Sequence, residues 1–351
     1  PPIKINIGDR LIGYGEPCFV IAEAGSNHNR DLTQAFKLID IAVNAGADAV
    51  KFQTFSAEKL YSKKTPKMSY LKEKKLTSET ESVWDMMKQA ELPRQWHKEL
   101  ASYCREKGIL FFSTPFDLKA VDELEEIGVG VYKIASFEIV DLELLKKIAK
   151  TKKPVIISRG MASIEEIELA VQTLKENGTS EVAVLHCVSS YPALPEEMNL
   201  ATIPDIAKRF KVVTGLSSHA LGITDAVASI PFGASIVEKH FTLSRADGGV
   251  DAGFSLEPAE LKQMVQAIRE AEKAVGKVQY GSGLKEAENA VFRRSLYVIK
   301  DIKAEEIFTR ENVRCIRPGY GLAPKFLPKV LGKKAVKDIE RGIALSFDLV
   351  K

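Results

Sequence analysis

Eight short apolar runs recur along residues 18–242, and segments whose apolar residues repeat at helical spacing separate most of them. One such segment places Ala35, Leu38, Ile39 and Ala42 on a single helical face. The runs cover residues 18–25, 47–54, 108–116, 129–136, 153–160, 182–192, 211–219 and 235–242. Eight units of a strand followed by a helix predict an α/β fold, the (β/α)8 TIM barrel.

The pattern changes after the last predicted helix. Ser255 is its expected cap, Pro258 suits its first turn, and its apolar stripe consists of Leu261, Met264, Val265, Ile268, Ala271 and Val275. Residues 276–290 contain glycines and little apolar material, which predicts a linker between a barrel domain over residues 1–275 and a second domain. Residues 291–351 hold short β-like runs, SLYVIK and VRCIRPG, and predict that this second domain is small, separate and β-rich.

Composition and charge narrow the classes of partner. The 50 basic and 47 acidic residues nearly balance, and a short basic patch at residues 72–75 is typical of a solvated face, so nucleic acid is not expected. The four cysteines are far apart and form no CxxC pair, which favours a reducing compartment. The sequence shows no apolar stretch long enough to span a bilayer and no signal-peptide core at its start. We expect a soluble, cytoplasmic protein without a membrane partner.

Polar and ionisable side chains gather where the predicted strands end. Barrel enzymes use the carboxyl ends of their strands, so an active site is expected there. In the last run Glu238 and His240 share one face because neighbours on a strand alternate, and Lys239 can then point outward. The candidates at the strand ends are Glu23, Lys51, Gln53, Thr114, Lys133, Ser136, Glu138, Ser158, Ser189, Tyr191, Ser217, His219, Glu238 and His240.

Each candidate, taken alone, also has a purely structural explanation. Lys51 or Lys133 can pair with a neighbouring glutamate in an interior layer of the barrel, and Tyr191 can fill a turn before a proline. His186 lies on an apolar strand and is expected to be a hydrogen-bonded core residue. The recurrence of such groups at nearly every strand end is what favours an active site.

Two chemistries suit these residues. His219 and His240 end adjacent predicted strands and could share a metal, since imidazole together with carboxylate suits Mn²⁺, Zn²⁺ or Fe²⁺. Cationic and hydroxyl groups suit a phosphate, which carries close to two negative charges at neutral pH. The residues expected to surround the phosphate are Lys51, Thr114, Lys133, Ser136, Ser158 and Ser217. No glycine-rich phosphate loop is present in the sequence.

The stretches AEAGSNHN, AVKFQT, KIAS, LHCVSSYPA, GLSSH, EKHFT and IRPGYGL occur together along almost the whole chain. In this combination they resemble the sialic acid synthase family. The resemblance implies a (β/α)8 barrel followed by an antifreeze-like (SAF) domain. It also implies condensation of phosphoenolpyruvate with an amino-sugar aldehyde to give a nonulosonic acid and phosphate. A domain-swapped homodimer, in which the SAF domain of one subunit caps the barrel of the other, is expected.

The resemblance also implies roles for individual residues. His219 and His240 would bind a divalent metal, with Mn²⁺ favoured over Mg²⁺ or Co²⁺, and Glu23 would lie beside the reacting carbons. Phosphoenolpyruvate would be held by Lys51, Thr114, Lys133, Ser136, Ser158, Ser189 and Ser217. The sugar would be positioned by Gln53, Glu138, Tyr191 and Asp251, and by Arg317 from the SAF domain of the second subunit. The expected catalytic set is Glu23, Lys51, Lys133, His219 and His240.

Several stretches narrow the resemblance to one branch. SRADGG (244–249), FSLEP (254–258), FRRSLYV (292–298) and RPGYGLAPKFLP (317–328) look like pseudaminic acid synthases. These enzymes would use a 2,4-diacetamido-2,4,6-trideoxy hexose of the altrose type. AEAGSNHN is closer to the neuraminate branch. A mannosamine-type sugar, as in N-acetylneuraminate or legionaminate synthases, is therefore the alternative.

The chain departs from the family pattern at two positions. Arg159 follows Ser158 where the family usually has threonine, and Ser218 precedes His219 where the family usually has aspartate. Arg159 would then either add a contact to phosphate or carboxylate or point outward. Loss of the aspartate would weaken the hold on His219.

Two other functions fit parts of the sequence. A Schiff-base aldolase would use Lys133 as its nucleophile and would need no metal. A carbohydrate-binding protein without catalytic activity would use the C-terminal domain to recognise glycans. It would not need acids, lysines and histidines converging on one barrel mouth.

Overall fold

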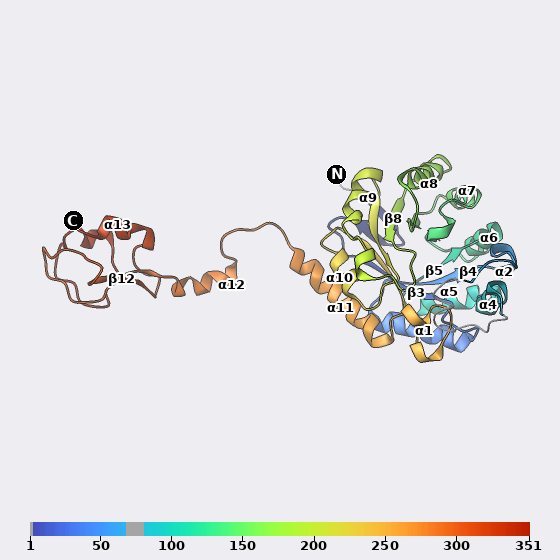
Figure 1. The fold of residues 1–351 in the computed structure, drawn as a ribbon, viewed down its shortest axis with the longest axis horizontal. Coiled ribbons are helices and arrows are strands. Elements are labelled where there is room, and N and C mark those ends of the chain that lie inside the picture. The colour runs from blue at the N-terminus through green and yellow to red at the C-terminus, as the bar shows by residue number, and fades with distance from the viewer. Residues whose placement is uncertain (1–2, 68–80) are drawn as a thin grey trace. The chain divides into compact units, whose positions relative to one another are not determined.

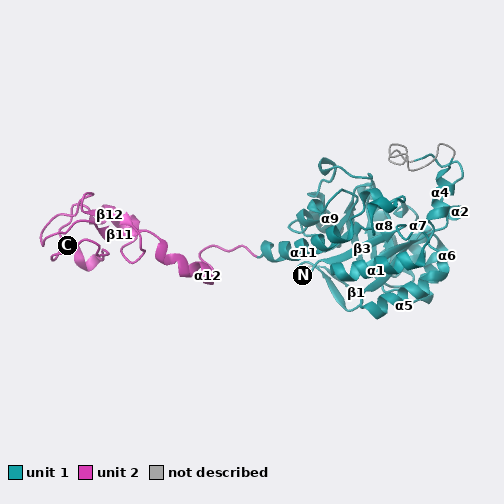
Figure 2. Ribbon diagram, turned by 90° about the horizontal axis from the view of Figure 1, so that it is seen from below, with its two compact units in different colours: residues 1–276 teal, residues 277–351 magenta. Residues whose placement is uncertain are grey.

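The computed structural model describes residues 3–67 and 81–351, and the basic patch at residues 72–75 lies outside them. The chain divides into two compact units, residues 1–276 and residues 277–351 (Figure 2). The predicted linker therefore falls at the start of unit 2, where it contains the short helix α12, Leu284–Ala287. Each unit has its own core and is described by itself.

Unit 1 is a barrel of eight parallel strands surrounded by helices (Figure 1). The strands are hydrogen-bonded in the order β5-β4-β3-β10-β9-β8-β7-β6, and β5 also contacts β6, so the sheet curves to near closure. Their bounds are β3 Phe19–Gly25, β4 Ala49–Thr54, β5 Leu110–Pro115, β6 Tyr132–Ile134, β7 Val155–Ser158, β8 Val182–Cys187, β9 Val213–Ser218 and β10 Ile236–His240. The predicted (β/α)8 barrel is confirmed.

Side-chain alternation divides each strand between two cores. On β3, Phe19 and Ile21 face the barrel interior, and Val20 and Ala22 pack against the helices. The interior cluster also contains Ile5, from the hairpin of β1 (Lys4–Ile7) and β2 (Arg10–Gly13). Period-two alternation therefore decides which residues at the strand ends face inward.

The helices follow the strands and cover the outside of the barrel (Figure 1). Polar caps begin several of them: Asp31 accepts hydrogen bonds from the first turn of α1, and Ser163 forms a capping box with Glu166 at α8. The helices are α1 Leu32–Ala45, α2 Ala57–Leu60, α4 Val83–Ala90, α5 His97–Lys107, α6 Leu118–Glu126, α7 Leu142–Ala149, α8 Ile164–Glu176, α9 Thr202–Phe210, α10 Thr224–Ser229 and α11 Pro258–Val275.

The last helix of unit 1 begins later than the sequence predicted. Its cap is Glu257, which shares a capping box with Glu260, and Pro258 is the first helical residue. Ser255 is not the cap, because its hydroxyl donates to the Asp251 carbonyl oxygen and accepts from the Asn27 amide. Ser255 instead joins two loops beside the strand ends.

Unit 2 has a small core and little regular structure. Strands β11 (Ser295–Val298) and β12 (Val313–Ile316) form an antiparallel pair, and helix α13 covers Leu327–Val330. The most buried side chains of its core are Leu296, Val298, Ile302, Phe308, Val330, Ala335 and Leu345. In the parts of the chain that the structure describes, neither unit contains a helix with the length and apolarity to cross a membrane.

Candidate active site

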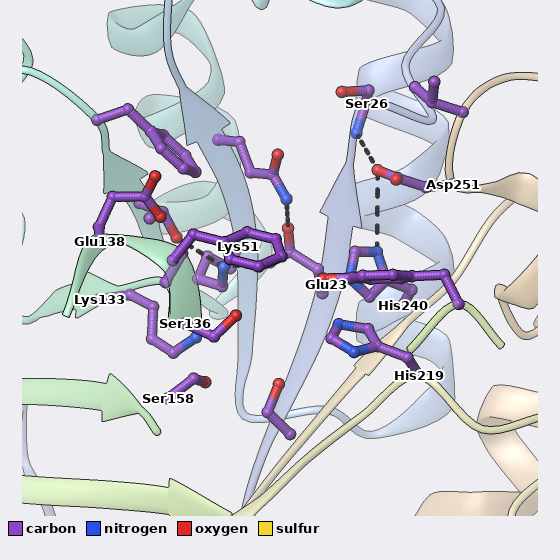
Figure 3. A pocket seen from close by; sticks show the side chains of 18 of the residues that line it. Glu23, Ser26, Lys51, Lys133, Ser136, Glu138, Ser158, His219, His240 and Asp251 are labelled. Atoms are coloured by element: carbon purple, nitrogen blue, oxygen red, sulfur yellow. Dashed lines mark hydrogen bonds and ion pairs between the residues drawn. The ribbon is translucent and has the colours of Figure 1, made fainter. Parts of the chain in front are cut away.

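A cavity that is open to solvent lies at the carboxyl ends of the barrel strands. Figure 3 shows its side chains: His219 and His240 lie on one side, and Lys133, Ser136 and Ser158 on the other. The predicted site residues that line the cavity are Glu23, Lys51, Gln53, Thr114, Lys133, Ser136, Glu138, Ser158, Tyr191, Ser217, His219, His240 and Asp251. The structure thus brings together side chains that are spread over almost 230 residues of sequence.

Strand register explains the convergence. Glu23 of β3 pairs with His240 of β10 on one side and with Lys51 of β4 on the other. Glu238 pairs with Ser217 of β9 in the same way. Each of these residues lies two positions after an inward-facing residue of the same strand. Its side chain therefore also faces inward, at the barrel mouth.

Four charged groups form the floor of the cavity. Lys51 Nζ lies 2.7 Å from Glu23 Oε2 and 3.7 Å from Glu238 Oε2. Lys133 Nζ lies 3.2 Å from Glu238 Oε1, which also accepts a hydrogen bond from Ser217 Oγ at 2.9 Å. Both lysines therefore pair with neighbouring glutamates, as their purely structural explanation predicts. The same ammonium groups also line an open cavity.

Burial and neighbouring charges separate the acidities of the two glutamates. Burial raises the pKa of Glu23 to about 7, although Lys51 opposes the shift. Burial alone would also raise the pKa of Glu238, but Lys133 and Lys51 outweigh it and lower this pKa to about 2. Glu23 can therefore exchange a proton near neutral pH, while Glu238 remains a carboxylate.

The two predicted metal ligands are buried, neutral imidazoles. Their ring centroids lie 5.5 Å apart, and burial lowers the pKa of His219 to about 4 and that of His240 well below its usual value. His219 Nδ1 lies 2.9 Å from the Val188 carbonyl oxygen, so this nitrogen carries the proton and Nε2 keeps its lone pair. His240 Nδ1 is buried and has no hydrogen-bond partner among the described residues.

These features fit a divalent cation held by two nitrogens. The described residues contain no group of three or more His, Cys, Asp and Glu side chains arranged as a metal site. The protein would thus supply the two imidazoles and leave other positions to water and substrate oxygens. The rings of Tyr191 and Phe254 pack against His219, with centroids 4.3 Å and 5.8 Å away.

Asp251 approaches this pair from a loop. Its Oδ2 accepts a hydrogen bond from the Ser26 backbone N–H at 3.2 Å and lies 3.9 Å from His240 Nδ1 (Figure 3). The approach needs a glycine at position 25, where φ is +52° and a Cβ would lie 2.5 Å from Asp251 Oδ2. Burial raises the pKa of Asp251.

Hydroxyl groups form the opposite side of the cavity. Thr114 Oγ1 accepts from Lys51 Nζ at 2.7 Å. Ser189 does not itself line the cavity; its Oγ donates to Ser136 Oγ at 3.0 Å from behind. Ser158 Oγ is buried without a hydrogen-bond partner among the described residues. A Cβ at Gly160 would lie 2.5 Å from the Ser136 side chain, so glycine permits this close packing of hydroxyls. Hydroxyls beside two ammonium groups suit a phosphate or carboxylate.

Sequence reasoning missed an apolar wall that borders the same cavity. It consists of Leu60, Val83, Met86, Met87 and Val250. Tyr61 also lines the cavity; burial, Glu138 and Asp251 raise the pKa of its hydroxyl to about 12. Four wall residues come from α2 and α4 in the connection after β4. This segment does not show the alternation of a strand. The only signal of it in the sequence is the unusually long stretch between the second and third predicted strands.

Arg159 does not line the cavity. Its guanidinium donates to His186 Nδ1 and to the Gly160 carbonyl oxygen, and His186 Nε2 donates to the Met198 carbonyl oxygen. The expectation that His186 is a hydrogen-bonded core residue is confirmed. Of the two alternatives for Arg159, the outward position is the one found. Arg317 is exposed after β12 in unit 2, so its role in the site stays a prediction.

Comparison with known proteins agrees with this geometry. Residues 38–280 match the NeuB family, and residues 293–351 match the SAF domain. The chain belongs to the NeuB family. The resemblance to sialic acid synthases and the C-terminal SAF domain are therefore confirmed.

Relatives of this NeuB-family chain carry more than one name. It is 43% identical to the N,N'-diacetyllegionaminic acid synthase of Campylobacter jejuni serotype O:2, over 91% of this chain and 96% of that protein. It is 40% identical to the pseudaminic acid synthase of C. jejuni serotype O:23/36, over 93% and 95%. The solved N-acetylneuraminic acid synthetase of Leptospira borgpetersenii matches with a TM-score of 0.73 and 36% identity, over 82% of this chain and 95% of that chain.

Proposed function

We propose that this protein is a nonulosonic acid synthase that condenses phosphoenolpyruvate with a 2,4-diacetamido-2,4,6-trideoxy hexose. The altrose-type sugar is the favoured substrate, so the product would be pseudaminic acid. One observation carries the proposal: two ammonium groups, a set of hydroxyls, a glutamate with a pKa near 7 and two neutral imidazoles face one cavity. Names of the relatives support the synthase class and divide over the sugar.

The bond changes assign each side of the cavity a task. C3 of phosphoenolpyruvate forms a bond to the aldehyde carbon of the sugar, and the aldehyde oxygen takes up a proton. Water then adds at C2 and loses a proton. The C2–O bond to phosphate then breaks, and the C2 hydroxyl passes its proton to the departing phosphate, which leaves the 2-keto acid.

The residues of this chain bind and orient the reactants. Lys51 and Lys133 would hold the phosphate and carboxylate of phosphoenolpyruvate, and Ser158 Oγ, unpartnered in the described structure, would donate to one of them. Glu23 would move a proton between the water and the reacting carbons, since its pKa lies near neutrality. A divalent ion held by His219 and His240, with Mn²⁺ favoured, would supply Lewis-acid polarisation of the aldehyde.

The apolar wall favours the trideoxy sugar class. Leu60, Val83, Met86 and Met87 offer carbon and sulfur atoms to the substrate and no hydroxyl acceptor. Such a wall suits a C6 methyl and the methyl of an acetamido group. A C6 hydroxyl placed there would lose its hydrogen bonds to water without replacement. N-acetylmannosamine carries that hydroxyl, while both the altrose and the mannose trideoxy sugars carry the methyl.

The arrangement of subunits remains part of the proposal. Arg317 would reach the sugar from the second subunit of a domain-swapped homodimer. A His219→Ala chain and an Arg317→Ala chain, each inactive alone, should then regain activity when mixed and exchanged, because one barrel of the mixed dimer is intact. No regained activity in a verified mixed dimer would contradict the swapped arrangement.

The deciding experiment measures phosphate release from phosphoenolpyruvate with Mn²⁺. The altrose-type trideoxy sugar would be compared with N-acetylmannosamine and with its 4-acetamido-6-deoxy analogue, each with and without EDTA. EDTA-sensitive release with the altrose sugar alone is expected. Release with a mannosamine-type sugar would keep the chemistry and overturn the choice of sugar. Borohydride trapping at Lys133 with a carbonyl substrate, insensitive to EDTA, would instead favour a Schiff-base aldolase.

A further inference from the structure

Lys239 is fully buried on the face of β10 that turns away from the cavity. The expectation that it points outward, opposite Glu238 and His240, holds, but outward here means into the layer between strands and helices, where its exposure is 0%. Its ammonium donates to Ser218 Oγ at 2.9 Å and to the Ala220 carbonyl oxygen at 2.7 Å. A buried ammonium needs a compensating negative charge, because removing it from water is costly.

Asp225, from helix α10, supplies that charge. Its Oδ1 lies 3.3 Å from Lys239 Nζ, and its Oδ2 accepts a short hydrogen bond from Ser218 Oγ. Asp225 is itself nine-tenths buried. In the part of the chain that the structure describes, it is the one carboxylate within ion-pair distance of Lys239.

The cluster of Ser218, Asp225 and Lys239 lies directly behind the two imidazoles. Ser218 immediately precedes His219, the contacted carbonyl of Ala220 immediately follows it, and Lys239 immediately precedes His240. Lys239 and Ser218 are register partners across β10 and β9. One ammonium group therefore binds the residues on both sides of His219, through the Ser218 hydroxyl and the Ala220 carbonyl oxygen, and connects them to the strand that carries His240.

We propose that Ser218, Asp225 and Lys239 are positioning residues that set the orientation and spacing of His219 and His240. The ammonium needs one carboxylate, and in this chain helix α10 provides it instead of β9. This explains why Ser218 can stand directly before His219 without leaving Lys239 unpaired. The cluster touches no substrate, and its value for metal binding rests on the proposed function.

The geometry makes a sharp rescue test available. Asp225→Ala leaves Lys239 without a counter-charge, whereas the double variant S218D/D225A returns a carboxylate to a position that already lies 2.9 Å from the ammonium. Ser229→Ala is the matched control, since Ser229 is fully buried on the same helix and its hydroxyl donates to the Ala226 carbonyl oxygen of that helix. All four proteins would be compared at equal temperature below their unfolding transitions.

The first readout is independent of activity. The chain contains five histidines, so selective ¹⁵N labelling gives a spectrum in which the imidazole nitrogens of His219 and His240 can be assigned. In the wild type His219 should show the tautomer protonated at Nδ1, which donates to Val188. We expect Asp225→Ala to shift or broaden the signals of both imidazoles, the double variant to restore them, and Ser229→Ala to leave them unchanged.

The second readout is the affinity for Mn²⁺ alone, measured from the free-ion signal in electron paramagnetic resonance. Asp225→Ala should weaken binding about 10- to 100-fold, as is common when groups that orient metal-binding histidines are lost, and the double variant should recover most of it. Unchanged imidazole signals in Asp225→Ala would overturn the positioning role. If the wild type binds no Mn²⁺ while the spectra behave as expected, the metal in the proposed function fails and the positioning role stands.

Discussion

Two buried polar layers lie on opposite faces of the same strand ends. The inner layer contains Glu23, Lys51, Lys133 and Glu238, and the outer layer contains Ser218, Asp225 and Lys239. Both pair buried lysines with carboxylates, so residue type and burial do not distinguish them.

The difference lies in the polar atoms left without partners. Ser158 Oγ, Glu138 Oε2 and His240 Nδ1, on the inner side, have no hydrogen bonds within the described chain. In the outer layer both carboxylate oxygens of Asp225 and the hydroxyl of Ser218 are engaged. Buried polar groups normally find partners, so unpartnered ones beside a cavity indicate that a ligand completes the set. The inner layer is suited to bind substrate and the outer layer to support it.

The largest expected effect comes from the inner layer. Glu23→Gln keeps the shape of the side chain but removes a group that can exchange a proton near pH 7. Turnover should fall at least about 100-fold, while phosphoenolpyruvate binding remains within a few-fold. Steady-state phosphate release and a calorimetric titration with phosphoenolpyruvate would measure the two quantities. Near-normal turnover would remove Glu23 from the chemistry.

A matched pair of lysine variants tests directly whether the inner layer binds substrate and the outer layer supports the structure. Lys133→Met leaves Glu238 close to Lys51, so the free energy of unfolding should change little while phosphoenolpyruvate binding is lost. Lys239→Met leaves Asp225 buried without its counter-charge, which should lower the free energy of unfolding by about 3–5 kcal/mol. Urea unfolding and ligand titration of both variants would check this. Equal stability losses would show that the two layers are not separate in role.

Acid should weaken unit 1 through its buried histidines. All five histidines lie in this unit, and burial lowers the pKa of His28, His97, His186 and His219 to about 4. In the unfolded chain a histidine has a pKa of about 6.5, so the unfolded state binds more protons between pH 6.5 and 4. The stability that these histidines contribute is therefore full above about pH 6.5 and is lost as the pH falls toward 4, by up to about 3 kcal/mol for His219 alone. Burial raises the pKa of Glu23 and of Glu138 to about 7, which acts in the opposite direction but involves fewer groups.

Fluorescence can follow this loss in the intact protein, because Trp84 and Trp96, the two tryptophans, both lie in unit 1. The urea midpoint reported by tryptophan should fall steadily between pH 6.5 and 4. A midpoint that does not change over this range would show that the buried imidazoles do not dominate the response of unit 1 to acid.

The sequence alone determined the barrel and most of the inner layer. Period-two alternation after an interior residue such as Phe19 or Ile236 fixes which face Glu23 and Glu238 take, and parallel strands bring their carboxyl ends together. These are local rules applied to eight similar units, so strand-end positions from Glu23 to His240 could be named before any coordinates. Asp251 and Arg317 lie outside the strands and were named only through the family resemblance.

Only the tertiary structure decided which helices contact which strand residues, because strands and helices follow different sequence periods. The charge partner of Lys239 comes from α10, 14 residues earlier, and the apolar wall comes from short helices after β4. Helix placement depends on how whole faces pack, which alternation along one strand does not encode. The serine at position 218, where the resemblance led us to expect an aspartate, leaves no charge unpaired in three dimensions. Asp225 of a neighbouring helix pairs with Lys239, since a buried ammonium requires a counter-charge and not a particular position in the chain.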